Sequence, residues 1–134
     1  MIIVSACLLG ICCRYDGQSK PEARILELVA RRKGVIPVCP EQLGGLPTPR
    51  SAAYITAGLD GFAVLAGNAR VRNIDGRDVT ENFRRGAEQV SEIARLYGVR
   101  RAILKSKSPS CGVSGCTGVA AAALILRGLD LEEI

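Results

Sequence analysis

Apolar residues occur in two kinds of pattern along this chain. Short aliphatic runs lie within residues 2–6, 35–38 and 101–105. Runs of this length with few polar positions predict strands of the parallel type, which are buried on both faces. Between and after them, apolar residues recur at helical spacing. The predicted helices begin at about residues 19, 78 and 117 and end before the glycines at positions 34, 98 and 128.

Capping patterns support two of these helices. Ser19 with Glu22, and Asp78 with Glu81, have the spacing of a capping box, in which two side chains bind the free backbone N–H groups of a helix start. Gly34 is suited to end the first helix. The pair Gly67-Asn68, between residues 62–66 and 69–72, predicts a β-hairpin. Residues 40–49 and 106–115 are predicted loops long enough to suggest a function.

Alternation of strands and helices predicts the fold class. It favours an α/β fold with a mostly parallel sheet, helices on both faces in three layers, and a small β-hairpin. The chain has 134 residues, 48% of them apolar and 4% aromatic, which suits one domain over residues 1–134 with an aliphatic core.

Composition narrows the possible functions. The chain contains no His, which excludes Ser-His and Cys-His dyads and zinc sites that need imidazole. Its net charge is +5, but basic residues do not form long runs and aromatic residues are scarce, so we do not expect nucleic acid as a partner. The apolar N-terminus lacks a basic leader and no apolar stretch is long enough to cross a bilayer, so we expect a cytoplasmic protein without membrane contact.

Cysteines follow three of the predicted strands. Cys7 follows the first strand, Cys39 the second, and Cys111 lies in the loop after a later strand. Loops after the carboxyl ends of parallel strands share one edge of the sheet, so these cysteines are expected to converge. Cys13 lies in the first loop and can join them. In a reducing compartment such thiols indicate a soft-metal site for zinc, copper(I) or an iron–sulfur cluster, although free Cys is also a common core residue.

Three further side chains are candidates for catalysis. Glu41 lies two residues after Cys39 and can act as a general acid or base, or be a solvated loop residue. Asp16 belongs to an Asp-Gly turn and either reacts or pairs with Arg14. Ser108 lies in a segment rich in hydroxyl and N–H groups that can bind an anion or the carbonyl oxygen of a heterocycle.

Several segments together resemble one bacterial family. The similar segments are residues 4–10, 13–17, 37–50, 78–80 and 108–112, and the run Cys-Pro-Glu-Gln-Leu-Gly-Gly-Leu at 39–46 is the most specific. The family was long known only as a domain of unknown function and includes the iron–sulfur-dependent thiouracil desulfidase. The resemblance extends over almost the whole chain.

The resemblance implies an enzyme with a 4Fe-4S cluster held by three cysteines, leaving one iron open. Such an enzyme removes sulfur from thiouracil without net redox change, giving uracil and hydrosulfide. By motif match the ligands are Cys7, Cys39 and Cys111, and the acid/base residue is Glu41. Cys13 matches a family cysteine whose role is open. The implied partner is a small thiolated heterocycle, and the oligomeric state is open.

The chain departs from the family after Gly112. Other members have a longer stretch there with a Tyr-Asp-Gly-like turn and a Phe, whereas here residues 113–118 lead directly to the last helix. Cys12 and Cys116 are additional thiols that we do not expect to be ligands. Two hypotheses follow: a desulfidase acting on a thiolated pyrimidine or related thioamide, or a metal- or cluster-binding sensor or sulfur-handling module without turnover.

Overall fold

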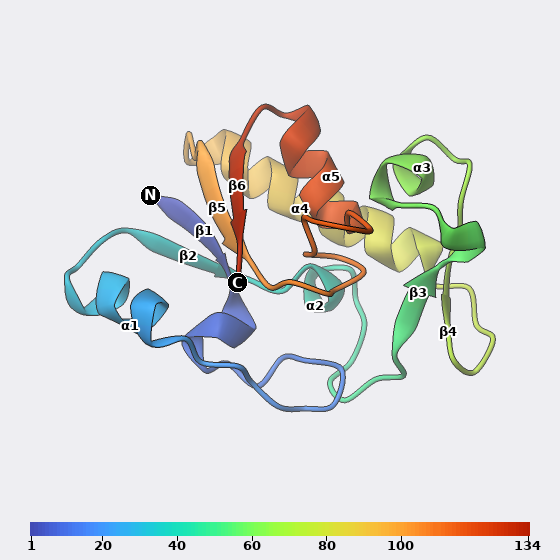
Figure 1. Ribbon diagram of the computed structural model, residues 1–134, viewed down its shortest axis with the longest axis horizontal. Helices are drawn as coiled ribbons and strands as arrows, with labels where there is room; N and C mark the ends of the chain where they lie inside the picture. Colours follow the sequence, from blue (N-terminus) through green and yellow to red (C-terminus); the bar gives the residue numbers. More distant parts are fainter.

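A parallel sheet of four strands forms the centre of the computed structural model, which describes residues 1–134 (Figure 1). In spatial order the strands are β2 (Val35–Val38), β1 (Ile2–Ser5), β5 (Arg101–Leu104) and β6 (Asp130–Glu133), and every neighbouring pair is parallel. The chain therefore leaves β1 toward one side for β2 and returns to the other side for β5. This reversal places a crevice at the carboxyl ends of β1 and β5.

Helices cover both faces of this sheet (Figure 1). α4 (Thr80–Leu96) and α5 (Val119–Leu126) pack on one face and α1 (Ala23–Ala30) on the other. The shorter helices lie outside these layers: α2 (Pro40–Leu43) packs against α4, and α3 (Gly61–Leu65) packs against α5. Two 3-10 helices are η1 (Ala6–Leu9) and η2 (Thr56–Gly58). None of the helices is long and apolar enough to cross a membrane.

Successive strand residues point to opposite faces, and the core divides accordingly. Ile3 of β1 packs in one cluster with Val90 of α4 and Leu124 of α5. Its neighbour Val4 packs in another cluster with Ile25 of α1. The predicted three-layer α/β arrangement is therefore confirmed.

The predicted hairpin exists, but in another place. It consists of β3 (Ala53–Ile55) and β4 (Val71–Asn73), which pair antiparallel, whereas most of residues 62–66 lie in α3. The physical reason is a helix cap: the Asp60 side chain accepts a hydrogen bond from the Ala63 N–H at 3.0 Å. Gly67 then ends this short helix with a positive φ of 82° instead of forming a hairpin turn.

Helix starts also differ from their predicted positions. α1 begins at Ala23, and its N-cap residue Glu22 makes no side-chain cap. Residues 20–22 instead run beside η1, where the N–H groups of Lys20 and Glu22 bind the carbonyl oxygens of Cys7 and Leu8 at 2.9 Å. These bonds satisfy donors that a longer helix would leave free.

The remaining boundaries differ by smaller amounts. At α4 the Asp78 carboxylate accepts from the Thr80 N–H at 2.9 Å, although the N-cap residue is Val79. Arg32, with φ of 55°, makes the left-handed turn after α1 that was expected of Gly34. The predicted loop after Cys39 starts with the short helix α2. The strand β6 was not predicted, because its mostly acidic residues lack the aliphatic pattern of the other strands.

Glycines let α2 lie directly against α4. A Cβ atom added at Gly86 of α4 would overlap the carbonyl oxygen of Pro40, and one at Gly44 would overlap the carbonyl oxygen of Asn82. Both obstacles are backbone atoms, which cannot rotate away. This close approach fixes the helix that directly follows Cys39.

We expect Gly86→Ala to lower the free energy of unfolding by about 1–3 kcal/mol, since the overlap with backbone outweighs the higher helix propensity of Ala. Urea unfolding followed by circular dichroism measures the change. Glu88→Ala, at an exposed position of the same helix, is the control and should stay within about 0.5 kcal/mol of the parent chain. Equal stability of Gly86→Ala and the parent would contradict the close packing of α2.

Candidate functional site

A cavity of about 350 Å³ lies at the carboxyl edge of the sheet. Its walls come from the segments that follow β1, β2 and β5, together with Ala52 and Ala53 at the start of the hairpin. The volume is at the lower end of the range of roughly 300–1,000 Å³ for small-molecule sites. Its position matches the crevice expected where the strand order reverses.

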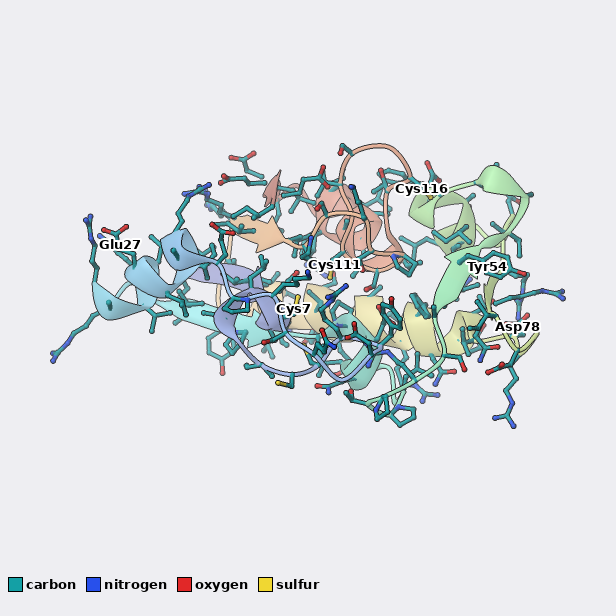
Figure 2. All side chains as sticks on the ribbon, turned by 60° about the horizontal axis from the view of Figure 1, so that its bottom comes forward. Cys7, Glu27, Tyr54, Asp78, Cys111 and Cys116 are labelled. Carbon is teal, nitrogen blue, oxygen red and sulfur yellow. The ribbon has the colours of Figure 1, made fainter.

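This cavity is lined by most of the candidate residues that the sequence analysis selected. They are Cys7, Cys13, Cys39, Cys111, Glu41 and Ser108. The exposed cysteines are not part of the lining: Cys12 lies in the first loop, and Cys116 lies near α3, where Figure 2 shows it well away from Cys7 and Cys111. The four cysteines taken from the strand-end loops are thus brought together, and the two additional thiols are not.

Asp16 is outside the cavity lining, although Arg14 and Tyr15 belong to it. The Asp16 carboxylate accepts a hydrogen bond from the Gln18 N–H at 3.0 Å and lies 3.9 Å from the Arg14 guanidinium. These contacts are those of a turn residue. Of the two interpretations of Asp16, the structure favours turn formation.

Three thiols influence one another's ionisation. The Cys39 thiol donates a hydrogen bond to the carbonyl oxygen of Cys13 at 3.6 Å. Interaction with the Cys13 thiol lowers the pKa of Cys7 and of Cys39 and raises the pKa of Cys13 itself. For Cys39 the value falls to about 6, with further help from the backbone N–H of Gln42 and the charge of Arg50. Cys7 and Cys39 are therefore the thiols best prepared to bind metal, because the thiolate is the ligand form.

Cys111 is in a different environment. Burial raises the pKa of its thiol to about 12, and the neighbouring hydroxyls of Ser5 and Ser110 oppose this shift only in part. The Ser110 Oγ lies 3.7 Å from the Cys111 sulfur. Without a bound cation nearby, this thiol keeps its proton at neutral pH.

These pKa values predict selective alkylation in the cluster-free protein. At pH 6.5 to 7, iodoacetamide should modify Cys39 much faster than Cys111, because about half or more of Cys39 is thiolate and Cys111 is buried and protonated. Peptide mass spectrometry of a time course gives both rates, and the exposed Cys12 and Cys116 report general reagent access. Equal rates at Cys39 and Cys111 would contradict this description of the two environments.

Glu41 is held at both carboxylate oxygens. Its Oε1 accepts from the Arg50 Nε at 2.9 Å, and its Oε2 accepts from the Ser110 hydroxyl at 2.9 Å. The Ser110 hydroxyl in turn lies 3.0 Å from that of Ser108, which accepts the N–H groups of Ser110 and Cys111. A continuous line of hydroxyls thus leads from Ser108 to the carboxylate.

Sequence reasoning missed Arg50 and Ser110. Both lie within segments of the family resemblance, but no role was attached to them there. The available signal was weak: Arg50 ends a loop rich in Pro and Gly, and Ser110 directly precedes Cys111. Only the fold shows that both contact the same carboxylate, because Ser110 is 69 residues from Glu41 along the chain.

Cysteine thiolates are soft donors of the kind that bind iron–sulfur clusters, and four cysteines line the cavity. No three His, Cys, Asp or Glu side chains gather closely enough to hold one metal ion. In a 4Fe-4S cluster each cysteine binds a different iron, so the ligands are spread around a larger group. The lining also includes cationic side chains, whose charge favours the thiolate form of nearby cysteines. They are Arg14, Lys20, Arg50, Lys105 and Lys107.

Fold and site together define an α/β protein with a cysteine-lined cavity at the carboxyl edge of a parallel sheet. The chain belongs to the 2-thiouracil desulfurase family, whose model matches residues 2–131.

Two similar proteins extend this result. The chain is 45% identical over 112 residues to the uncharacterized protein YbbK of Bacillus subtilis (strain 168). This match covers 84% of this chain and 73% of YbbK. Among solved structures it is similar to the 4Fe-4S-dependent thiouracil desulfidase TudS. That match has a TM-score of 0.83 and 37% identity and covers 98% of this chain and 89% of TudS.

Proposed function

We propose that this chain is a cluster-dependent desulfidase that hydrolyses a thiolated pyrimidine. In the proposed reaction thiouracil and water give uracil and hydrosulfide with no net oxidation or reduction. The observation that carries the proposal is the meeting of Cys7, Cys39 and Cys111 with Glu41 in one cavity. The similarity to TudS, described as a 4Fe-4S-dependent thiouracil desulfidase, supports the choice of cofactor and substrate.

Cys7, Cys39 and Cys111 would hold the cluster, and Cys13 would be a neighbouring thiol. Each proposed ligand comes from a different strand-end segment, so cluster binding joins three parts of the chain. When bound by three cysteines, a 4Fe-4S cluster supplies one iron with an open position that can act as a Lewis acid toward the sulfur of the substrate.

Glu41 is the proposed general base in this site. Water is a weak nucleophile, and a carboxylate that takes one of its protons promotes attack on the ring carbon that carries sulfur. The carbon–oxygen bond then forms, the carbon–sulfur bond breaks, and sulfur leaves as hydrosulfide. Ser108 would bind the heterocycle, and its hydroxyl can pass a proton through Ser110 to Glu41, because the oxygens along this line are 3.0 and 2.9 Å apart.

Reaction in water enriched in oxygen-18 tests the proposal. The protein is reconstituted anaerobically with iron and sulfide and given thiouracil without a reductant. We expect uracil and sulfide in equal amounts, with one oxygen-18 atom in each uracil, and no product from cluster-free protein. Uracil without the label would contradict hydrolysis by solvent water. A fully loaded cluster without any turnover would support the alternative, a binding or sulfur-handling module.

A further inference from the structure

Arg50 connects the two loops that carry the first three thiols of the site. Its Nη2 donates to the carbonyl oxygen of Cys13 at 2.9 Å, and its Nε donates to Glu41 Oε1 at 2.9 Å. A third nitrogen, Nη1, donates to Thr48 Oγ1 at 3.0 Å and to the carbonyl oxygen of Pro47 at 3.2 Å. The Arg50 backbone N–H also binds the carbonyl oxygen of Tyr15 at 2.8 Å.

This side chain is almost completely buried. Only 6% of the Arg50 side chain is exposed, against 12% for Glu41. A guanidinium presents its donors in one rigid plane, so all three nitrogens can be used at fixed angles to one another. A lysine ammonium would carry the same charge but could not bind the carboxylate and the backbone of the other loop in this geometry.

Other arginine–carboxylate pairs of the chain lack these features. The pair between Arg70 and Asp78 has the same 2.9 Å separation, but its side chains are 51% and 38% exposed, and it lies at the hairpin. Solvent and salt weaken such a pair, whereas the Arg50 pair is shielded. The buried pair is thus the one able to fix a side chain.

We propose that Arg50 is the positioning residue of Glu41, a role that rests on the proposed function of Glu41 as general base. The guanidinium fixes Oε1 against the backbone of the first cysteine loop and leaves Oε2 directed to the hydroxyl of Ser110. The carboxylate thereby keeps one orientation relative to Cys13 and Cys39. Since a misplacement of about 1 Å can cost about 100-fold in rate, this orientation matters for turnover.

A double-mutant cycle between Arg50 and Glu41 tests the role. The variants are Arg50→Gln, Arg50→Lys, Glu41→Gln and the double variant Arg50→Gln/Glu41→Gln, with Arg70→Gln as matched control. Turnover per bound cluster and KM are measured on reconstituted protein. Thermal unfolding is measured on the same cluster-free chains, so that the coupling is also measured without turnover.

We expect Arg50→Gln to lower kcat by up to about 100-fold with a smaller change in KM and near-normal cluster content. Arg50→Lys should restore part of that loss, and Arg70→Gln should match the parent. The double variant should be no slower than Glu41→Gln alone, because Arg50 acts through Glu41. In cluster-free protein the loss of Tm in the double variant should be smaller than the sum of the single losses.

Additive effects on both kcat and Tm would overturn the proposal, since they would show Arg50 and Glu41 acting independently. Normal turnover of Arg50→Gln at full cluster content would overturn it as well. Absence of turnover in the parent chain would instead contradict the proposed function, and the unfolding cycle would still decide whether Arg50 holds Glu41.

Discussion

Replacing Cys7, Cys39 or Cys111 by serine is expected to abolish stable cluster binding. A hydroxyl is a harder and poorer iron ligand than a thiolate, and with three ligands each loss leaves only two. Iron and sulfide analysis with visible absorption after anaerobic reconstitution measures the effect. Cys12→Ser and Cys116→Ser are the controls and should keep the cluster nearly intact, because both cysteines are exposed and outside the cavity.

One result would reverse the assignment of Cys111 as third ligand, and it concerns Cys116 in the shortened loop after Gly112. Loss of the cluster in Cys116→Ser, together with its retention in Cys111→Ser, would place the third ligand at Cys116. The positions in the fold make that exchange unfavourable, since the exposed Cys116 thiol donates to the carbonyl oxygen of Leu59 at 3.0 Å and is not part of the cavity lining.

Glu41→Gln is expected to keep the cluster spectrum and to lower desulfidation by at least about 100-fold. Glutamine retains the size of the side chain and its contact with Ser110, but it cannot take a proton from water. General base catalysis is worth about 100- to 10,000-fold, and the chain has no His to replace the carboxylate. Anaerobic turnover per bound cluster is the measurement.

Asp16→Asn is the matched comparison for this prediction. Asp16 fixes its turn through Arg14, whose guanidinium lies 3.9 Å from the carboxylate, and asparagine lacks the charge for this pair, so the replacement should reduce cluster retention or folding as much as rate. Near-normal turnover in Glu41→Gln, with a collapse in Asp16→Asn at equal cluster content, would move the acid/base role to Asp16.

The strands explain why much of the site could be predicted. Parallel strands buried on both faces leave a clear aliphatic signal, as in β1 and β5, and the rule that their carboxyl ends share an edge needs only the strand order. Cys7 and Cys111 could therefore be placed together although they are more than a hundred residues apart. The cavity that both line follows from that topology.

Other features depend on contacts that the sequence pattern does not contain. The hairpin was misplaced because Gly67-Asn68 suits both a helix end and a turn, and the cap from Asp60 decides between them. α2 was hidden in a loop rich in Pro and Gly, since four residues give no helical periodicity. The contact of Arg50 with Glu41 and Cys13 joins two loops, and only the folded chain brings them together.

Stepwise loading of the cluster shows whether desulfidation depends on it. Cluster-free protein is reconstituted anaerobically to increasing iron content, and thiouracil turnover is measured on each preparation alongside its visible spectrum. We expect turnover to rise in proportion to the 4Fe-4S cluster bound and to be absent without it. Desulfidation by cluster-free protein, or turnover unrelated to cluster content, would contradict the claim that Cys7, Cys39 and Cys111 hold the centre of the chemistry.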